Sequence, residues 1–288
     1  MVDHPQRRNL LALGGAGAVV AATALDGPRA AAQAAPTSLL RTVLDRGHLI
    51  VGTGSTNPPW HFEDDKGKLT GMDIAMARIL AKGLFDDETK VEYVMQDPNA
   101  RIPNITTGKV DVVIQFMTVS PARAQLVNFS RPYYVEGAAL LTTPSGKWQT
   151  YNALKAAGSQ VRASVLQNVD ADTLVHSALP QAQVMQLDTQ ANVIQAIAAN
   201  RADVAVVDAS TVKWLVKRNP GVYTNPGYAY ESMLYSAAVR QSDFDWLHWI
   251  DTCFNVAMHG NEPEIYTAAF EEFFGEKPPP QVPGFPPI

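Results

Sequence analysis

Cysteine is nearly absent from this chain of 288 residues, since Cys253 is the only one. A single cysteine excludes an internal disulfide framework, a redox pair of closely spaced cysteines and a zinc site built from several thiolates. Because Cys253 lies within an apolar helical pattern, we expect a buried and unreactive thiol there.

A surplus of positive charge is also missing. Lys and Arg together number 23 against 28 Asp and Glu, which gives a net charge of −5. Nucleic-acid binding requires Lys and Arg gathered on one face, so this balance argues against nucleic acid as the main partner. The chain is 46% hydrophobic and 18% charged, a composition that excludes a disordered protein and suffices for one large domain or two ordinary ones.

Catalytic and metal-binding motifs are lacking too. The six histidines show neither HExxH nor HxH spacing, and no Gly-x-Ser-x-Gly element occurs. Each histidine is therefore expected at the surface, and neither a metal nor a cofactor is expected. The glycine-rich residues 14–17 are only superficially similar to a phosphate loop, because they follow no strand.

Residues 1–34 have the composition of an export signal peptide. Arg7 and Arg8 precede an uncharged run over residues 9–25, and small residues follow at 30–35. The paired arginines resemble a twin-arginine signal. The alternative, a membrane anchor, is disfavoured because the run is short and weakly hydrophobic for a span of about 20 residues. We expect a soluble mature protein that is periplasmic or secreted.

Short apolar runs alternate with helical patterns along the rest of the chain, as they do in units of strand, helix and parallel strand. Two such sets of equal size are separated by extended segments near residues 138–143 and 232–238. This arrangement predicts two lobes with a ligand cleft between them. The expected domains are lobe 1 at residues 35–141 and 234–275, lobe 2 at 142–233, and a Pro-rich disordered tail at 276–288.

The hydrophobic periodicity also predicts individual elements. Strands are predicted over residues 48–53, 91–95, 110–114, 160–166, 183–187 and 203–207. Helices are predicted over residues 71–84, 102–107, 170–178, 189–200, 209–217, 244–258 and 264–274.

Two charged residues follow predicted strands and suit a small zwitterion. Arg123 comes after strand 110–114, and its guanidinium can hold a carboxylate through two parallel hydrogen bonds. Asp208 ends the strand at 203–207, where it can pair with an ammonium group. The alternatives are a surface arginine and an aspartate that caps the next helix, and spacing alone leaves them open.

Residues 117–134 begin Met-Thr-Val-Ser-Pro-Ala-Arg and end Phe-Ser-Arg-Pro-Tyr-Tyr. This segment is the most specific of several that resemble the periplasmic solute-binding proteins of polar amino-acid ABC importers. The resemblance covers residues 45–275, and further similar segments lie at 49–60, 66–74, 101–111, 200–208 and 270–275. It implies an α/β, two-lobed type II periplasmic binding protein fold, in which each lobe is a mostly parallel sheet flanked by helices and two hinge crossings join the lobes.

The resemblance also implies a set of ligand-binding residues. Arg123, assisted by Thr118, is expected to hold the ligand α-carboxylate, and Asp208 is expected to pair with the α-ammonium group. Trp60 and Asn57 occupy places where relatives line the side-chain pocket. The full candidate set is Arg123, Asp208, Thr118, Trp60, Asn57, Gln115, Met117, Asn168, Val169 and Asp170.

Departures from the family bear on the ligand. Relatives have a turn of Gly, Ser and Thr that helps to bind the carboxylate, whereas this chain has Asn168, Val169 and Asp170. Val169 offers no hydroxyl, and Asp170 repels an anion unless it serves as a helix cap. Gly54 stands where binders of lysine and arginine tend to carry an acid, and Gln115 replaces a small residue. We therefore expect a neutral or polar amino acid or a related compound.

The function implied by the resemblance is that of an extracytoplasmic solute-binding protein, not an enzyme, which captures an amino acid or amino-acid-like solute between two lobes and delivers it to an ABC permease. A monomer is expected. One alternative is an enzyme similar to cyclohexadienyl (prephenate or arogenate) dehydratase, with Asp170 as the candidate general acid. The Trp-Pro signature and lysine of those enzymes are missing at residues 96–99. The other alternative is a ligand-binding partner of a membrane sensor.

Overall fold

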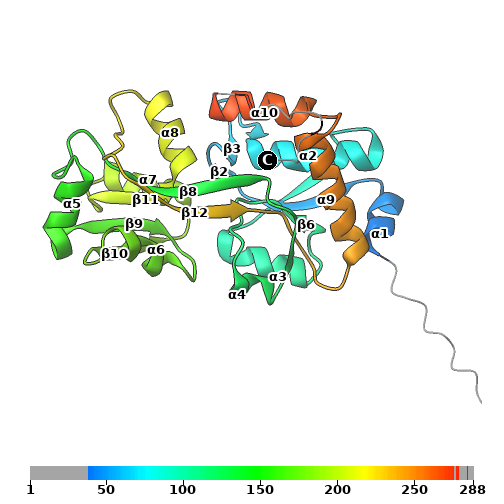
Figure 1. The fold of residues 1–288 in the computed structure, drawn as a ribbon, viewed down its shortest axis with the longest axis horizontal. Helices are drawn as coiled ribbons and strands as arrows, with labels where there is room; N and C mark the ends of the chain where they lie inside the picture. The colour runs from blue at the N-terminus through cyan, green and yellow to red at the C-terminus, as the bar shows by residue number, and fades with distance from the viewer. Residues whose placement is uncertain (1–37, 276, 279–283, 285–288) are drawn as a thin grey trace, which may run out of the picture. The chain divides into compact units, whose positions relative to one another are not determined.

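The computed structural model describes residues 38–275, 277, 278 and 284. The predicted export signal at residues 1–34 and most of the predicted tail at 276–288 lie outside these residues. The described chain forms two five-stranded sheets and one three-stranded sheet, with helices packed against them (Figure 1). The predicted mixture of helices and mostly parallel strands is therefore confirmed. Within the described residues, no helix combines the length and apolar composition needed to cross a membrane.

The first sheet has the strand order β5-β1-β6-β13-β7. β1 pairs in parallel with β5 and β6, whereas β13 is antiparallel to β6 and β7. The carboxyl ends of β1 and β6 consequently open on the same edge, which is where ligands bind in such sheets. The strands are β1 (Leu49–Thr53), β5 (Val91–Met95), β6 (Val112–Val113), β7 (Asn128–Phe129) and β13 (Ala238–Val239).

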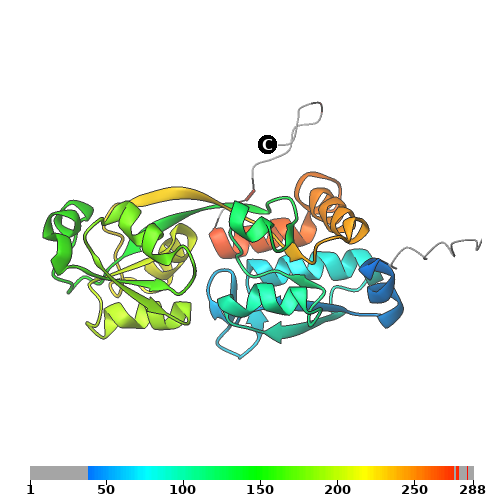
Figure 2. The ribbon, with the colours of Figure 1, turned by 90° about the horizontal axis from the view of Figure 1, so that it is seen from below.

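Helices from both ends of the chain pack on this sheet. The buried helix α2 lies against both α9 and α10 (Figure 2). The helices are α1 (Leu39–Arg46), α2 (Met72–Phe85), α3 (Arg101–Thr106), α4 (Pro121–Ala124), α9 (Phe244–His259) and α10 (Glu264–Phe274), with a short 3-10 turn at Pro98–Ala100. A small sheet precedes α2 and comprises β2 (Thr56–Asn57), β3 (His61–Glu63) and β4 (Leu69–Thr70).

The second sheet has the strand order β10-β9-β11-β8-β12. β9 is parallel to β10 and β11, and β8 is antiparallel to β11 and β12. Its strands are β8 (Tyr134–Leu141), β9 (Arg162–Leu166), β10 (Gln183–Leu187), β11 (Val204–Asp208) and β12 (Ala229–Tyr235). Its helices are α5 (Tyr151–Ala157), α6 (Ala171–Ala178), α7 (Gln190–Ala198) and α8 (Ala209–Arg218), with a 3-10 turn at Gly158–Gln160.

Two connections between the sheets lie side by side. Residues 130–133 lead from β7 into β8, and residues 236–237 lead from β12 into β13. The amide of Ser130 donates to the carbonyl of Ala237 at 2.9 Å, and the Ser130 hydroxyl accepts from the Ala237 amide at 3.0 Å. The strand ends of both sheets are thus held close to one another.

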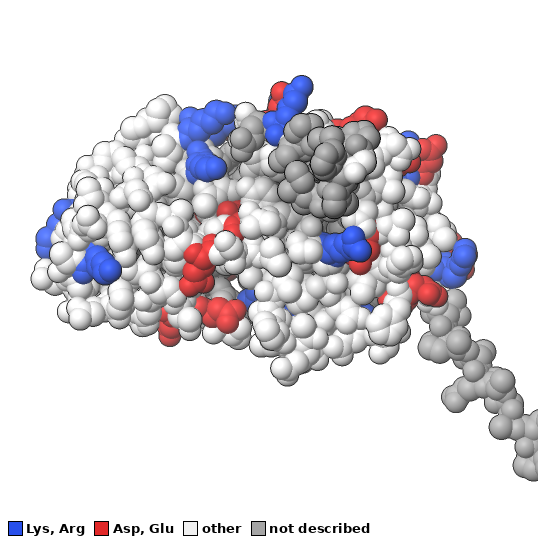
Figure 3. All heavy atoms as spheres, viewed as in Figure 1, with Lys and Arg blue, Asp and Glu red and all other residues white. Residues whose placement is uncertain are grey.

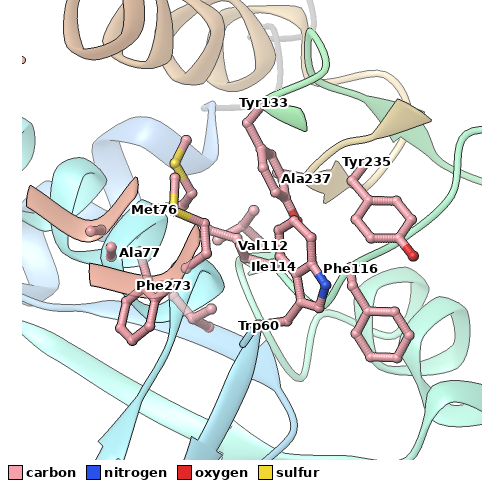
Figure 4. Close-up of a cluster of buried hydrophobic side chains, with 14 of the residues drawn as sticks. Trp60, Met76, Ala77, Val112, Ile114, Phe116, Tyr133, Tyr235, Ala237 and Phe273 are labelled. Atoms are coloured by element: carbon pink, nitrogen blue, oxygen red, sulfur yellow. The ribbon is translucent and has the colours of Figure 1, made fainter. Parts of the chain in front are cut away.

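An aromatic cluster fills the core where these connections pass. Trp60 is fully buried and lies edge-on to Tyr235, with the ring centroids 5.1 Å apart (Figure 4). Phe116 and Tyr235 are also neighbours, at 6.1 Å. The indole nitrogen of Trp60 donates to Ser210 Oγ at 3.0 Å, which links the core of the first sheet to helix α8.

Most predicted elements occur, but one prediction about side chains is wrong. His61 is only 2% exposed, and its Nδ1 lies 2.8 Å from Asp73 Oδ2. A surface position was expected because the histidines lack metal-binding spacing, and the nearby acidic residues Glu63, Asp64 and Asp65 also suit an exposed turn. The partner that permits burial comes instead from the start of α2, twelve residues away.

Cys253 is half-buried on α9, and burial raises the pKa of its thiol to about 12, which agrees with the prediction of an unreactive side chain.

On the face shown in Figure 3, Lys and Arg occur in small separate groups. That face therefore lacks the continuous basic surface that a nucleic-acid partner requires.

Candidate ligand-binding site

A cavity of about 320 Å³ lies at the strand ends of the second sheet and is also lined by residues from the first. Its volume is in the range of small-molecule sites. Two of its side chains carry opposite formal charges, namely Arg123, which is buried, and Asp208, which is partly buried and whose Oδ2 is enclosed. The remaining lining residues are Arg101, Phe116, Thr118, Ser120, Ala138, Val165, Leu166, Asn168, Asp170, Thr173, Leu174, Gln190, Val206, Val207, Glu231, Ser232, Met233 and Tyr235.

Arg123 lies on the short helix α4, which Pro121 begins and Ser120 caps through a hydrogen bond to the Arg123 amide. Its side chain is 9% exposed, so the alternative of a surface arginine is wrong. One guanidinium nitrogen donates to the carbonyl of Thr118 at 2.8 Å, and another lies 3.4 Å from Asp170 Oδ2. Burial lowers the pKa of Arg123, and the nearby Asp170 carboxylate raises it. The remaining donors are available for a ligand anion.

Asp208 ends β11 and precedes α8. It occupies the N-cap position, yet its side chain makes no capping hydrogen bond. Oδ1 accepts from the Tyr235 hydroxyl at 2.7 Å, whereas Oδ2 is buried without a hydrogen-bond partner among the described residues. Burial and the nearby Glu136 carboxyl raise the pKa of Asp208 well above its usual value. A buried carboxyl oxygen without a partner is costly, unless a ligand supplies a donor.

The turn after β9 brings Asp170 to the cavity. Asn168 Oδ1 accepts from the Asp170 amide at 2.9 Å, and the Asp170 side chain makes no capping hydrogen bond to α6. The Asp170 carboxylate is 60% exposed and faces Arg123 instead. Val169 is 84% exposed and lines neither this cavity nor the adjoining one.

A second cavity of about 220 Å³ adjoins the first, since Phe116, Leu166 and Gln190 line both. Asn57 and Gln115 line this second cavity, and neither polar atom of the Asn57 amide has a hydrogen-bond partner among the described residues. Its remaining lining is Gly54, Ser55, Thr56, His61, Met95, Gln96, Asp97, Pro98, Asp188 and Thr189. The Gln115 amide is hydrogen-bonded to Gln96, so the Asn57 amide is the group in this wall that suits a neutral polar partner.

The ten residues expected from the sequence are thus divided by the structure. Seven polar residues line the first cavity or the second, namely Arg123, Asp208, Thr118, Asn168, Asp170, Asn57 and Gln115. Trp60 and Met117 are fully buried in the core and line neither cavity. The resemblance placed Trp60 in a pocket, whereas here its indole packs against Tyr235 and Tyr134.

Sequence reasoning missed three residues that shape the site, namely Tyr235, Glu136 and Arg101. Tyr235 donates to Asp208, and Glu136 raises the pKa of that carboxyl. Arg101 is buried, and its guanidinium carbon lies 5.4 Å from the centre of the Phe116 ring. Burial, followed by the charge of Arg123, lowers the pKa of Arg101 to about 10. The one available signal was a charged residue, Glu136, inside the apolar strand β8.

Comparisons with known proteins agree with this fold and site. Residues 49–275 match the family described as bacterial extracellular solute-binding proteins, family 3. The chain is 28% identical over 205 residues to the glutamine-binding protein of Geobacillus stearothermophilus, covering 68% of this chain and 74% of that protein. It is also 28% identical over 213 residues to the L-cystine-binding protein TcyJ of Escherichia coli (strain K12), covering 74% and 78%.

A solved structure shows the same architecture. It is that of the ancestral amino acid-binding protein AncCDT-1, described as a precursor of cyclohexadienyl dehydratase. The TM-score is 0.72 at 28% identity, and the match covers 82% of this chain and all of that one. The predicted two-lobed binding-protein fold is therefore confirmed.

This chain belongs to family 3 of the bacterial extracellular solute-binding proteins. The predicted class of function, solute binding in amino-acid transport, is confirmed by the same comparisons. Among the described residues, no group of three or more His, Cys, Asp and Glu side chains is arranged to hold a metal ion.

Proposed function

We propose that the protein captures an α-amino acid in the cavity between its two larger sheets and delivers it to an ABC permease. The observation that carries the proposal is the pair of oppositely charged groups in one cavity, Arg123 with free donors and Asp208 with an unpartnered oxygen. Arg123 binds the ligand carboxylate and Asp208 its ammonium group. In the closed form the ligand contacts both charged groups at once, whereas in the open form it does not. Ligand binding therefore favours the closed form.

The second cavity supports a side chain that is polar and uncharged. The amides of Asn57 and Gln115 line it, and His61 at its base is engaged with Asp73. A relative named for glutamine fits this chemistry, because the glutamine side chain is an uncharged amide. We therefore propose a neutral polar amino acid as the ligand class, with Asn57 among the residues that read its side chain.

We further propose how the chain is divided and where it acts. The lobe bounds expected from the sequence, residues 35–141 with 234–275 and residues 142–233, assign β8 to lobe 1. Because β8 pairs with β11 and β12 in the second sheet, we propose instead that the lobes are residues 35–133 with 236–275, and residues 134–235. The proposed hinge lies in the two connections at residues 130–133 and 236–237. The proposed site of action is outside the cytoplasm, reached by the twin-arginine route, and the proposed state is a monomer.

Thermal shift against single amino acids tests the binding proposal. A ligand present at 100 times its dissociation constant adds about 2.7 kcal/mol, which raises the melting temperature by roughly 5–10 °C in a chain of this size. We expect L-glutamine or L-cystine to give such a shift with the wild type. Arg123→Ala removes the guanidinium and abolishes the shift, whereas Arg201→Ala, at an exposed position, retains it.

Two outcomes contradict the proposal. An equal shift in the Arg123→Ala variant means that the carboxylate binds elsewhere. No shift with any zwitterion, combined with turnover of prephenate or arogenate that is lost in Asp170→Asn, favours the dehydratase-like alternative.

A further inference from the structure

Two carboxyl side chains lie together at the start of helix α8. In the antiparallel pair of β8 and β11, Asp208 is opposite Ala138, so Glu136 is its diagonal neighbour on the same face of the sheet. Glu136 is 4% exposed and accepts hydrogen bonds from the amide and the hydroxyl of Ser210. Asp208 lines the cavity, and Glu136 lies beside it in the buried region outside the cavity lining.

Within the described part of the chain, neither carboxyl forms an ion pair with a Lys, Arg or His side chain. Glu136 has three donors, which are the amides of Gly137 and Ser210 and the Ser210 hydroxyl. Asp208 has one donor, the Tyr235 hydroxyl, and its Oδ2 has none. The hydrogen bonds are thus distributed so that Glu136 is stabilised as an anion and Asp208 is not.

The other charged and titratable groups around the pair do not compensate for this difference. Lys213 on α8 favours the ionised form of Glu136, although burial keeps the pKa of that carboxyl raised. On the side of Asp208, Glu136 on β8 and Asp73 on α2 both add negative charge, whereas the Tyr235 hydroxyl on β12 and, to a smaller extent, the Asn57 side chain on β2 lower the pKa of this carboxyl. Two negative charges in this buried region without a cation are unfavourable.

We propose that Asp208, which lines the cavity, binds the ligand ammonium group and that the buried Glu136 beside it is coupled to it in titration: the empty pair of carboxyls holds one proton, which is released to solvent when a ligand ammonium group binds. The inference rests on the proposed function and deepens it. The bound cation supplies the positive charge and the hydrogen-bond donors that the proton supplied before. The ligand amine keeps its own protons, so one proton leaves for each ligand bound.

The sign of the pH dependence follows from this exchange. At low pH the proton competes with the ligand, and affinity is weak. As pH rises toward the raised pKa of the empty pair, the proton is removed more easily and affinity increases, by up to about tenfold per pH unit. Above that pKa the empty site is already ionised, and affinity becomes independent of pH.

Calorimetric titration of the full chain measures the released proton directly. The probe is whichever of L-glutamine, L-cystine, L-histidine and L-arginine gives the largest thermal shift, titrated at a series of pH values from 4 to 8 in buffers of different ionisation enthalpy. The slope of binding enthalpy against buffer enthalpy, corrected for any ionisation of the free probe, is expected to show release of up to about one proton at low pH and progressively less as pH rises through the pKa of the empty pair. The deaminated counterpart of the same probe, which lacks the ammonium group, is expected to bind more weakly and to release no proton.

Glu136→Gln is the informative variant. Its side-chain carbonyl oxygen can still accept a hydrogen bond from the backbone amide of Ser210, whereas the negative charge of Glu136 is removed. We expect proton release to fall to less than half of the wild-type value and the increase in affinity with pH to flatten. Glu271→Gln, at an exposed position on α10, is the matched control and keeps the wild-type slope. Binding with no proton release in the wild type overturns the inference while leaving the proposed function intact.

Stability without ligand provides a second, independent readout. A carboxyl whose pKa is higher in the folded chain than in the unfolded chain makes the fold less stable as pH rises from about 4 toward the folded pKa. Asp208→Asn removes this penalty and can still accept from Tyr235. Its melting temperature is therefore expected to exceed that of the wild type at pH 8, and the difference is expected to shrink toward pH 4. If the difference in melting temperature between Asp208→Asn and the wild type does not change with pH, the inference that the empty pair of carboxyls holds a proton is overturned. This result does not depend on whether any of the four amino acids binds.

Discussion

Asp170 places a carboxylate against the arginine that we assign to the ligand carboxylate, with 3.4 Å between Asp170 Oδ2 and the Arg123 nitrogen. At this residue the chain departs from its family, because the expected turn of Ser and Thr is replaced. The carboxylate is largely exposed, so solvent screens the pair, and such pairs contribute about 0.2–1 kcal/mol. Asp170 therefore competes with the ligand without preventing its binding.

The first prediction concerns this competition. Asp170→Asn removes the competing charge and is expected to tighten amino-acid binding by about 1.4- to 5-fold. Titration calorimetry at low and high salt measures the change, which is expected to diminish as salt screens the pair. Asp172→Asn, at an exposed position in the first turn of α6, controls for net charge. Weaker binding by Asp170→Asn contradicts the competition and indicates that Asp170 contacts the ligand.

At the scale of elements, the start of α2 organises the first lobe. Asp73 accepts from the Phe116 amide at 2.9 Å and from the Tyr133 hydroxyl at 2.7 Å. Phe116, which lines both cavities, has a φ of 35°, and so the carboxylate supports a backbone conformation that non-glycine residues rarely adopt. The position of α2 therefore influences the conformation of Phe116 in the cavity lining.

Gly71 fixes that position and gives the second prediction. Its φ is 124°, and an added Cβ would lie 2.2 Å from the carbonyl oxygen of Trp60. Gly71→Ala is therefore expected to destabilise the fold by at least about 2 kcal/mol. Gly67 has a φ of 73° but open space around it, so Gly67→Ala is expected to cost only about 1 kcal/mol. Urea unfolding measures both, and equal losses would show that backbone strain rather than the close approach limits Gly71.

At the scale of the whole molecule, function depends on export as well as on binding. The third prediction tests the proposed route, in which Arg7 and Arg8 are recognised together. In a bacterial host that has the twin-arginine pathway, replacing both with lysine is expected to leave the precursor in the cytoplasm. Arg29→Lys is the control and is exported. Cell fractionation with immunoblotting measures the distribution, and undiminished export of the double variant points to the general secretory route.

Local patterns predicted the elements better than their pairing. The helix at residues 264–274 is confirmed at both ends, and the helix at 244–258 extends by one residue. The strand predicted over 110–114 shortens to Val112–Val113, because its length depends on pairing with β1 and β13 rather than on its own apolar residues. A strand takes its bounds from partners that are distant in sequence.

The sequence by itself determined the class of this protein, because apolar periodicity and family signatures are properties of short segments. It also singled out Arg123 and Asp208, which stand where strands end. Only the tertiary structure decided which charged groups meet, namely Asp170 with Arg123 and Glu136 with Asp208. The physical reason is that electrostatic interactions and desolvation act over a few ångströms, and these neighbours are separated by 47 and 72 residues of chain, so that sheet register and burial bring them together.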